Sequence, residues 1–430
     1  IYTSFSSYFT THTSKRLILK LLERFRSMSS KVRRKVKIKP IVILVVVLIL
    51  AVWGFGIFLF IHRDSISSNN KKQSTVSKKI AIQKEDVDYE AKVFMVGDAL
   101  IHSGVYYDAH QADGSYDFKP MLQYMKPIVS KYDIAYYNQE TVLGGTGMGL
   151  SSYPRFNSPQ EVGDAFLDAG FNTVSLATNH TMDMGEAGVL KSVEYWKSHP
   201  NVAASGQWSS YEDRNESIAK IYEVNHIKYA FISYTIWTNG LETPYGKDYL
   251  NNVYSPEKAT EDINRVRDKA DFVIVAMHWG TEYSWKTDYK QDEIAQHFSN
   301  LGVDLIIGAH PHVIQTVEYI NNNKTFVVYS LGNFISDQLD VDNYTGLAME
   351  VTLKKHVGQN GEVVNSVVEP KAELVYTVTT QRRGWSSDFR VKPYPTLTDS
   401  ELPNHAGLYE KYKAIVNECY PNLTWGLTWE

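Results

Sequence analysis

Five short apolar runs in the chain each lead into a side chain that can bind a metal ion. Open α/β sheets bind their ligands beyond the carboxyl ends of the strands, so these side chains are expected to converge at one sheet edge. Carboxylate, amide oxygen and imidazole together make a donor set for a divalent metal. The runs and the residues after them are 94–97 with Asp98, 134–137 with Glu140, 173–176 with Asn179 and His180, 272–276 with His278, and 303–309 with His310 and His312.

Each of these residues also has an ordinary structural explanation when it is taken alone. Asp98 follows a glycine in a common turn sequence, and Asn179 could be a turn residue. A single histidine such as His180 or His278 is more often part of a core. The pair His310 and His312 is a stronger signal, because Pro311 stiffens the segment and two alternate imidazoles can reach adjacent ions. The prediction of a metal site therefore rests on the whole set.

Expected helices alternate with these apolar runs. Ser158 and Ser255 each precede a proline, which is typical of a helix N-terminus. Alternating strands and helices predict an α/β sheet. The expected helices are residues 121–131, 159–169, 186–197, 256–269 and 289–301.

The pattern changes after Thr345. Residues 347–353 and 363–376 have the composition of strands, and Asn360-Gly361 between them indicates a hairpin. The sheet is therefore expected to gain antiparallel strands late in the chain. Residues 380–430, rich in proline and aromatic side chains, show no clear pattern. The expected organisation is a metal-binding domain over residues 91–345 and C-terminal strands with an extension over residues 346–430.

Residues 41–61 form a run of 21 residues without a charge. At ~1.5 Å rise per residue a helix of this length spans roughly 30 Å, the thickness of a bilayer core. The run is longer than a signal-peptide core, and residues 62–65 offer no small-residue cleavage site. It predicts an uncleaved transmembrane anchor, and the alternative is a buried core helix.

Charge predicts the orientation of this anchor. Residues 1–39 contain eleven lysines and arginines and one acid, Glu23. Basic flanks stay in the cytoplasm, so residues 1–40 are expected inside and the C-terminal part outside a bacterial cell. Met28, followed by Ser29-Ser30-Lys31, resembles a natural start, so residues 1–27 are expected to be upstream sequence. Residues 64–90, mostly polar and without apolar periodicity, predict a flexible stalk.

Net charge and cysteine content limit the partners and the kinds of site that this chain can have. Taking away the eleven basic residues and one acid of the N-terminal segment leaves 33 basic and 47 acidic residues, a net charge of −14. A domain this acidic is a poor nucleic-acid binder, so no nucleic acid is expected as a partner. Cys419 is the single cysteine, which excludes an intrachain disulfide and a cysteine-based zinc site.

The motifs together resemble the capsule-synthesis protein CapA family over roughly residues 91–340. Members of that family act in poly-γ-glutamate capsule assembly and are similar to calcineurin-like metallophosphoesterases. The resemblance implies a metallophosphoesterase-like mixed β-sheet sandwich flanked by helices. The segments that carry it are Gly97-Asp98, Asn138-Gln139-Glu140-Thr141, residues 177–185, His278-Trp279-Gly280, residues 308–312 and residues 330–334.

The same resemblance implies roles for the site residues. Glu140 would bridge two divalent ions. One ion would be completed by Asn179, His278 and His310, and the other by Asp98 and His312. His180 would act as a catalytic proton donor beside the metals. Asp183 could orient His180, or it could be an ordinary helix-capping carboxylate.

Two departures from the metallophosphoesterase pattern concern the first metal site. Asp98 is followed by Ala99-Leu100 rather than by a histidine two residues on, and His102 lies four residues away. Glu140 has no Gly-Asp before it. This site is therefore expected to bind its metal more weakly, to have a different shape, or to take His102 as a ligand. The resemblance implies catalysis less firmly than metal binding.

The expected function is a role in synthesis or export of an anionic polymer such as poly-γ-glutamate, carried out as a metal-dependent hydrolase. Paired ions ~3.5–4 Å apart would activate water for attack on a phosphoester or an amide. The donor set admits Mn, Fe or Zn. The rival hypotheses are a metallophosphoesterase acting on cell-envelope substrates and a non-enzymatic partner of a capsule synthase. Trp279, Tyr283 and Trp285 could line a polymer groove or simply cover the sheet edge.

Overall fold

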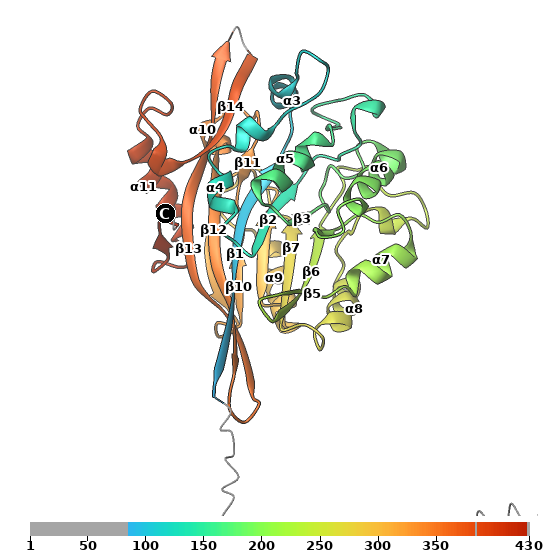
Figure 1. Ribbon diagram of the computed structural model, residues 1–430, viewed down its shortest axis with the longest axis vertical. Coiled ribbons are helices and arrows are strands. Elements are labelled where there is room, and N and C mark those ends of the chain that lie inside the picture. Colours follow the sequence, from blue (N-terminus) through green and yellow to red (C-terminus); the bar gives the residue numbers. More distant parts are fainter. Residues whose placement is uncertain (1–84, 383–384, 428–430) are drawn as a thin grey trace, which may run out of the picture. The chain divides into compact units, whose positions relative to one another are not determined.

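A computed structural model describes residues 85–382 and 385–427, which build two mixed β-sheets (Figure 1). The first sheet has the strand order β14-β13-β12-β1-β2-β3-β4, with β11 beside β1 and β15 beside β13. Strands β1 to β4 and β11 are parallel, whereas β12, β13 and β14 are antiparallel to their neighbours. Its strands are β1 (Val87–Ala99), β2 (Ile134–Gln139), β3 (Thr173–Ser175), β4 (Ala203–Ser205), β11 (Asn333–Ile335), β12 (Thr345–Val357), β13 (Val363–Arg382), β14 (Trp385–Pro393) and β15 (Thr424–Trp425).

The second sheet has the order β5-β6-β7-β8-β10-β9. Its four central strands are parallel, and the two outer strands are antiparallel to their neighbours. Its strands are β5 (Tyr222–Val224), β6 (Ile227–Thr235), β7 (Phe272–His278), β8 (Leu305–Ala309), β9 (Val317–Ile320) and β10 (Thr325–Val328).

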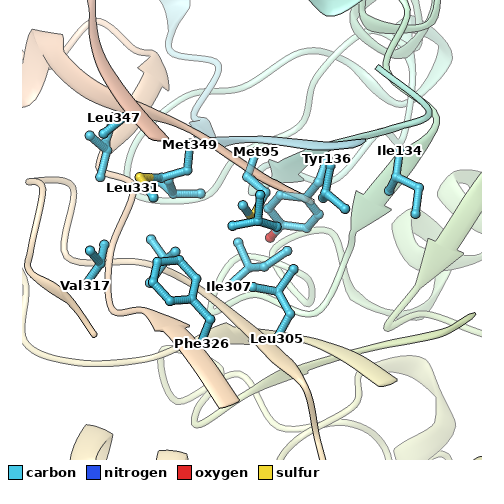
Figure 2. Close-up of a cluster of buried hydrophobic side chains, with 14 of the residues drawn as sticks. Met95, Ile134, Tyr136, Leu305, Ile307, Val317, Phe326, Leu331, Leu347 and Met349 are labelled. Carbon is cyan, nitrogen blue, oxygen red and sulfur yellow. The ribbon is translucent and has the colours of Figure 1, made fainter. Parts of the chain in front are cut away.

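The two sheets pack face to face around one apolar core. Figure 2 shows Met95 and Tyr136 of the first sheet above Leu305, Ile307 and Phe326 of the second. Successive side chains of a strand point to opposite faces. Both faces of these strands are buried, which is why they read as continuous apolar runs rather than as alternating ones.

Helices cover the outer face of each sheet. In β1, Phe94 and Val96 point away from the other sheet and pack against the first group of helices. In β7, Val273 and Val275 pack in the same way against the second group. The first group is α3 (Ser103–Ala109), η1 (Lys119–Leu122), α4 (Lys126–Val129), α5 (Glu161–Ala169) and α6 (Gly185–Lys197), and the second is α7 (Tyr211–Ile218), α8 (Pro256–Val266) and α9 (Tyr289–Asn300). The fold is thus the expected mixed-sheet sandwich flanked by helices.

The remaining elements are short or C-terminal. Tyr412 and Val416 of α11 (His405–Val416) pack at the margin of the core between the sheets. The others are η2 (Thr146–Met148), η3 (Asp248–Leu250), η4 (Tyr394–Thr396) and α10 (Val341–Tyr344).

Local sequence signals account for the long helices. Ser255 caps α8 by accepting a hydrogen bond from the Lys258 N–H, with Pro256 at the first helical position. Asp288 and Gln291 form a reciprocal capping box at the start of α9. Helix α5 ends at Gly170, whose φ of 108° is strained for any residue with a side chain. Four of the five expected helices are present, and these signals account for three of them, whereas α6 begins after Met184 without a side-chain cap.

The fifth expected helix, residues 121–131, is wrong in extent. The segment contains the end of η1 and the four-residue helix α4 instead. Pro127 lacks the N–H that a continuous helix would need there, and its ring clashes with the preceding turn. The late antiparallel strands are confirmed, with Gly361 at a φ of 83° in their hairpin. Strand β1 begins at Val87, so the sheet starts inside the segment expected to be a stalk.

The expected anchor at residues 41–61, the basic segment 1–40 and most of the expected stalk lie outside the described residues. Within residues 85–382 and 385–427, none of the helices has the length and apolar character needed to cross a bilayer.

Candidate metal centre

The expected ligands lie together where strand ends of the two sheets meet. Asp98 belongs to β1, Glu140 follows β2, and Asn179 follows β3, all from the first sheet. His278 ends β7, and His310 and His312 follow β8, all from the second sheet. The expectation of a single sheet edge is therefore wrong, because the oxygen donors come from one sheet and the imidazoles from the other.

Asp98, Glu140 and His312 form one group. The His312 Nδ1 atom lies 3.3 Å from Asp98 Oδ2, and its Nε2 atom lies 3.7 Å from Glu140 Oε1. One donor atom from each residue lies within 4.8 Å of the other two, so the three could surround a single ion. All three side chains are buried.

Glu140, His278 and His310 form a second group that shares Glu140 with the first. The His278 Nε2 atom is 3.7 Å from Glu140 Oε1 and 3.1 Å from His310 Nδ1. The side-chain oxygen of Asn179 lies 2.8 Å from the same His278 nitrogen. All six expected ligands are thus linked by contacts shorter than 4 Å.

The two carboxylate oxygens of Glu140 test whether these residues suit a metal. Both are buried and accept no hydrogen bond from the described residues. A buried carboxylate without a partner is costly, whereas a coordinated cation would satisfy it. His310 Nε2 is likewise buried without a partner in the described part of the chain. The donors that are present fit a pair of cations sharing Glu140.

Burial and neighbouring charges shift the pKa values of four ligands, lowering two of them and raising the other two. Burial, reinforced by neighbouring histidines, holds the pKa of His278 and of His310 well below the usual value, so both imidazoles are neutral. Burial alone would lower the pKa of His312, but Glu140 and Asp98 beside it raise it to about 9. Burial raises the pKa of Glu140 well above its usual range, against the opposing effect of His312. A cation in this position would replace that proton and favour the carboxylate.

The backbone around the ligands is tightly constrained. His310 and His312 have φ angles of 99° and 58°, a region that residues with side chains rarely adopt. Gly97 must be a glycine, because a Cβ atom there would lie 1.8 Å from the carbonyl oxygen of Gly332. This close approach lets the Asp98 N–H donate to Gly332 O at 2.9 Å and fixes the aspartate at the end of its strand. Such strain is characteristic of functional sites.

His180 lies beside the ligands and is held by Asp183. The His180 Nδ1 atom is 2.7 Å from Asp183 Oδ2, and the same oxygen accepts a hydrogen bond of 2.6 Å from the Phe156 N–H. Helix α6 begins two residues later with Met184 at its N-cap. Of the two explanations for Asp183, orientation of His180 is therefore the one that the geometry supports.

A cavity of about 570 Å³ opens beside this centre. Its wall includes His180, His312 and Tyr283. A second cavity, of about 430 Å³, shares Tyr283 with the first and includes Trp285. Tyr283 and Trp285 therefore fit the hypothesis that these aromatic residues line a polymer groove. Trp279 does not, because it is fully buried and its ring stacks on that of Tyr329 in the core.

Sequence reasoning missed three residues that contact the centre. Glu282 offers a carboxylate oxygen within 4.8 Å of His310 and His312 donor atoms, and its signal was a carboxylate four residues after His278. Asn138 donates to Asp98 Oδ1 at 2.8 Å, and the Asn333 side-chain oxygen lies 3.0 Å from His312 Nδ1. Both asparagines lie inside the quoted motifs.

His102 is placed outside the ligand groups of the described residues. Its Nδ1 atom is 3.1 Å from Leu100 O and 3.4 Å from the Asp337 N–H nitrogen, and its ring lines the first cavity. Burial lowers its pKa to about 4, so it is neutral. This geometry does not support His102 as a replacement ligand.

Comparison with known proteins gives a family match. The family model described as bacterial capsule synthesis protein PGA_cap matches residues 92–338. The PGA biosynthesis protein CapA of Bacillus subtilis (strain 168) is 30% identical over 202 residues, which is 45% of this chain and 49% of that protein. The capsule biosynthesis protein CapA of Bacillus anthracis is 28% identical over 218 residues, 49% of this chain and 50% of that protein. The chain thus spans about half the length of these relatives.

Solved structures with a similar arrangement are more distant. A novel phosphatase from Mycoplasma pneumoniae has a TM-score of 0.43 and 14% identity, covering 67% of this chain and 95% of that one. The calcineurin-like phosphoesterase YfkN from Bacillus subtilis has a TM-score of 0.39 and 12% identity, covering 76% and 98%.

Proposed function

The chain belongs to the bacterial capsule synthesis protein family PGA_cap, and from this premise we propose that it acts on poly-γ-glutamate as a hydrolase with two divalent metal ions. The family and the names of the two relatives support a role in capsule biosynthesis. The names of those relatives describe whole proteins, of which this chain spans about half. The hydrolytic step and the polymer substrate are therefore proposals for this chain.

The observation that carries the proposal is the state of Glu140. Its two oxygens are buried and lack hydrogen-bond partners among the described residues, and the residue is shared by both ligand groups. One ion would be held by Asp98, Glu140 and His312, and the other by Glu140, Asn179, His278 and His310. Bound in this way, the ions would polarise the attacked carbonyl and lower the pKa of a water molecule.

The protein's own residues would position the remaining parts of the reaction. Asn138 donates to Asp98 and keeps that carboxylate oriented. His180, fixed through Nδ1 by Asp183, presents its Nε2 atom, which has no hydrogen-bond partner among the described residues, beside the cavity. His180 would donate a proton to the leaving group, as a positioned histidine commonly does.

The alternative is a non-enzymatic role in which the metals attach the polymer to the protein or to a capsule synthase. The observation that favours it is charge. The chain after residue 39 carries a net charge of −14, so an anionic polymer would be repelled unless bound cations mediate contact. A metallophosphoesterase acting on cell-envelope substrates is the remaining hypothesis, which the same metal chemistry would serve.

The test is metal content and turnover of the purified full chain. We expect two Mn, Fe or Zn ions per chain, release of shorter fragments from poly-γ-glutamate, and loss of both after chelation. Turnover of p-nitrophenyl phosphate without polymer cleavage would favour the phosphoesterase. Metal-dependent polymer binding with no turnover would favour the binding role, and a metal-free protein with full activity would contradict all three.

We also propose a location, with residues 41–61 as a single membrane anchor and residues 64–430 outside the cell. Protease added to intact cells stripped of their wall should release the folded domain by cutting before residue 85. Complete protection from protease would reverse this topology.

A further inference from the structure

One arginine stands out in the wall of the 570 Å³ cavity. Among the described residues that line it, Arg155 is the only arginine or lysine, while Asp183 and Glu282 contribute carboxylates. An isolated guanidinium at the mouth of a largely acidic site is placed to attract one anionic group of a ligand. This residue is not part of the ligand set or of the family motifs quoted above.

Arg155 is held in a fixed orientation. Its Nε atom donates to the backbone oxygen of Asp183 at 2.8 Å, and its Nη2 atom donates to the same oxygen. The carboxylate of Asp183 at the same time holds His180 and the Phe156 N–H. Arg155 and His180 are therefore anchored to one residue, the first through its carbonyl and the second through its side chain.

The rest of the guanidinium is available to a ligand. An arginine has five N–H donors, and two are engaged by Asp183. Within residues 85–382 and 385–427, Arg155 makes no ion pair with a carboxylate. Fork-like donation to a carboxylate or a phosphate is the interaction that this group makes best.

We propose that Arg155 binds the α-carboxylate of the glutamyl residue whose nitrogen leaves when the γ-amide is cut. This inference rests on the proposed function, because it assumes that His180 protonates that nitrogen. In a γ-linked chain the leaving nitrogen and a free α-carboxylate are bonded to the same carbon atom. A guanidinium fixed beside His180 can hold that carboxylate and thereby place the nitrogen next to the proton donor.

The step balances with water as the co-reactant. The water oxygen joins the γ-carbonyl carbon, and the C–N bond breaks with its electron pair passing to nitrogen. His180 gives a proton to that nitrogen, and the proton released by water returns to His180. Arg155 changes neither its bonds nor its charge, so it is a residue that positions and selects the substrate.

The linkage of the polymer follows from this placement. In an α-linked chain the free carboxylate of every residue before the last is at the end of the side chain, two methylene groups further from the nitrogen. While the nitrogen faces His180, that carboxylate would therefore lie in a different place relative to Arg155. The arginine would therefore select γ-linked over α-linked glutamate.

The experiment measures binding in the full-length, metal-loaded protein carrying His180→Ala, which slows turnover. The ligands are γ-linked triglutamate, the same peptide with its α-carboxylates amidated, and α-linked triglutamate with its C-terminal carboxylate amidated. We expect Arg155→Gln to weaken binding of the γ-linked acid by about 10- to 100-fold, as for loss of a charged hydrogen bond, and to leave the amidated peptide unchanged. Arg155→Lys should restore part of the loss, because it keeps the charge without the fork.

Arg265→Gln is the matched control, because Arg265 is an arginine of α8 that is absent from the cavity wall. If Arg155→Gln weakened the binding of the acid and the amidated peptides equally, Arg155 would not recognise the carboxylate, and the inference would be overturned. The inference would also be overturned if the protein with Arg155 intact did not bind the γ-linked acid. It would be overturned as well if Arg155→Gln weakened the binding of p-nitrophenyl phosphate and of no peptide. Failure of the proposed function is a separate result, namely normal binding without cleavage when His180 is present.

Discussion

The side chain of Glu140 lies between His278 and His312, each 3.7 Å from its Oε1 atom. Removing a carboxylate and two imidazoles from water is unfavourable unless each finds a partner. Asp98 has a hydrogen-bond partner in Asn138, and His180 has one in Asp183, but Glu140 has none among the described residues. At the scale of single residues, this carboxylate without a hydrogen-bond partner is the reason to expect a bound cation.

Changing Glu140→Gln keeps the size of the side chain and removes its charge. We expect the purified protein to lose both ions, because the proposed sites share this residue. In the presence of chelator the variant should unfold at no lower temperature than the parent, since no buried charge is left uncompensated. Metal analysis and thermal unfolding check the two parts. The control is Glu282→Gln, which changes an exposed carboxylate near His310 and His312, and this variant should keep at least one ion. Full metal content in the Glu140 variant would contradict the shared-ligand assignment.

His180→Ala separates the catalyst from the ligands. Since His180 contacts Asp183 rather than the ligand groups, its loss should leave metal content and folding near normal. Turnover should fall by ~10²–10⁴-fold, the usual contribution of a positioned acid or base. His310→Ala should instead lose metal and activity together. If the His180 variant is stripped of metal, its assigned role is wrong, and if it keeps full turnover, His180 is not the proton donor.

At the scale of elements, strand β13 carries a buried acid that faces helix α11. Glu373 is 1% exposed, accepts a hydrogen bond of 2.9 Å from the Leu374 N–H, and lies near Tyr409 and Lys413 of the helix. Burial raises its pKa to about 7, against the opposing effects of these neighbours. The protein therefore holds a neutral carboxyl group here at mildly acidic pH.

This shift makes the stability of the protein depend on pH. Between the unfolded value of 4.5 and about 7, the unfolded chain releases the Glu373 proton while the folded one keeps it. Stability from this group is thus complete below pH 4.5 and is lost as pH rises through 7, by about 3 kcal/mol in all. Glu373→Gln should remove that loss, so the variant gains stability over the parent at pH 8 and not at pH 4.5.

Urea unfolding of both proteins at the two pH values measures this difference. Glu362→Gln, at an exposed residue by the hairpin turn, is the control and should change little at either pH. An equal effect of Glu373→Gln at pH 4.5 and pH 8 would show that the carboxyl group does not titrate as described.

At the scale of the whole molecule, the centre joins the two sheets. Asp98, Glu140 and Asn179 come from the first sheet, and the three histidines come from the second. Neither sheet contains a complete set of ligands. Ions bound here would connect the sheets at one end of the core that Figure 2 shows.

Removing the ions should therefore weaken the packing of one sheet on the other. A ligand that binds only the folded state stabilises it by about 3 kcal/mol when present at 100 times its dissociation constant. We expect chelation to lower the free energy of unfolding by roughly that amount for each ion, and hydrogen exchange to speed up at the ends of β2, β7 and β8. The variant Glu140→Gln should not respond to chelator. Unchanged stability and exchange in the parent protein after complete metal removal would contradict this coupling.

Much of this arrangement follows from the chain itself. Continuous apolar runs ending in Asp98, Glu140 and His278 indicated buried strands with polar ends, because a strand covered on both faces has no polar alternation. Ser255 before Pro256 marked the start of α8, since such capping signals act within a few residues. The helix predicted over residues 121–131 was wrong for a reason that is also local, because Pro127 interrupts it.

Tertiary structure decided what local signals cannot encode. An apolar run does not state which sheet it joins, so the division of oxygen donors and imidazoles between two sheets became visible only in the packed molecule. The contacts of Asn138 and Asn333 with ligands likewise depend on partners far along the chain. The sequence by itself determined the kinds of donor and the strand ends that carry them. Only the packing of the two sheets determined that Glu140 would be buried between both groups, because that position is set by long-range contacts.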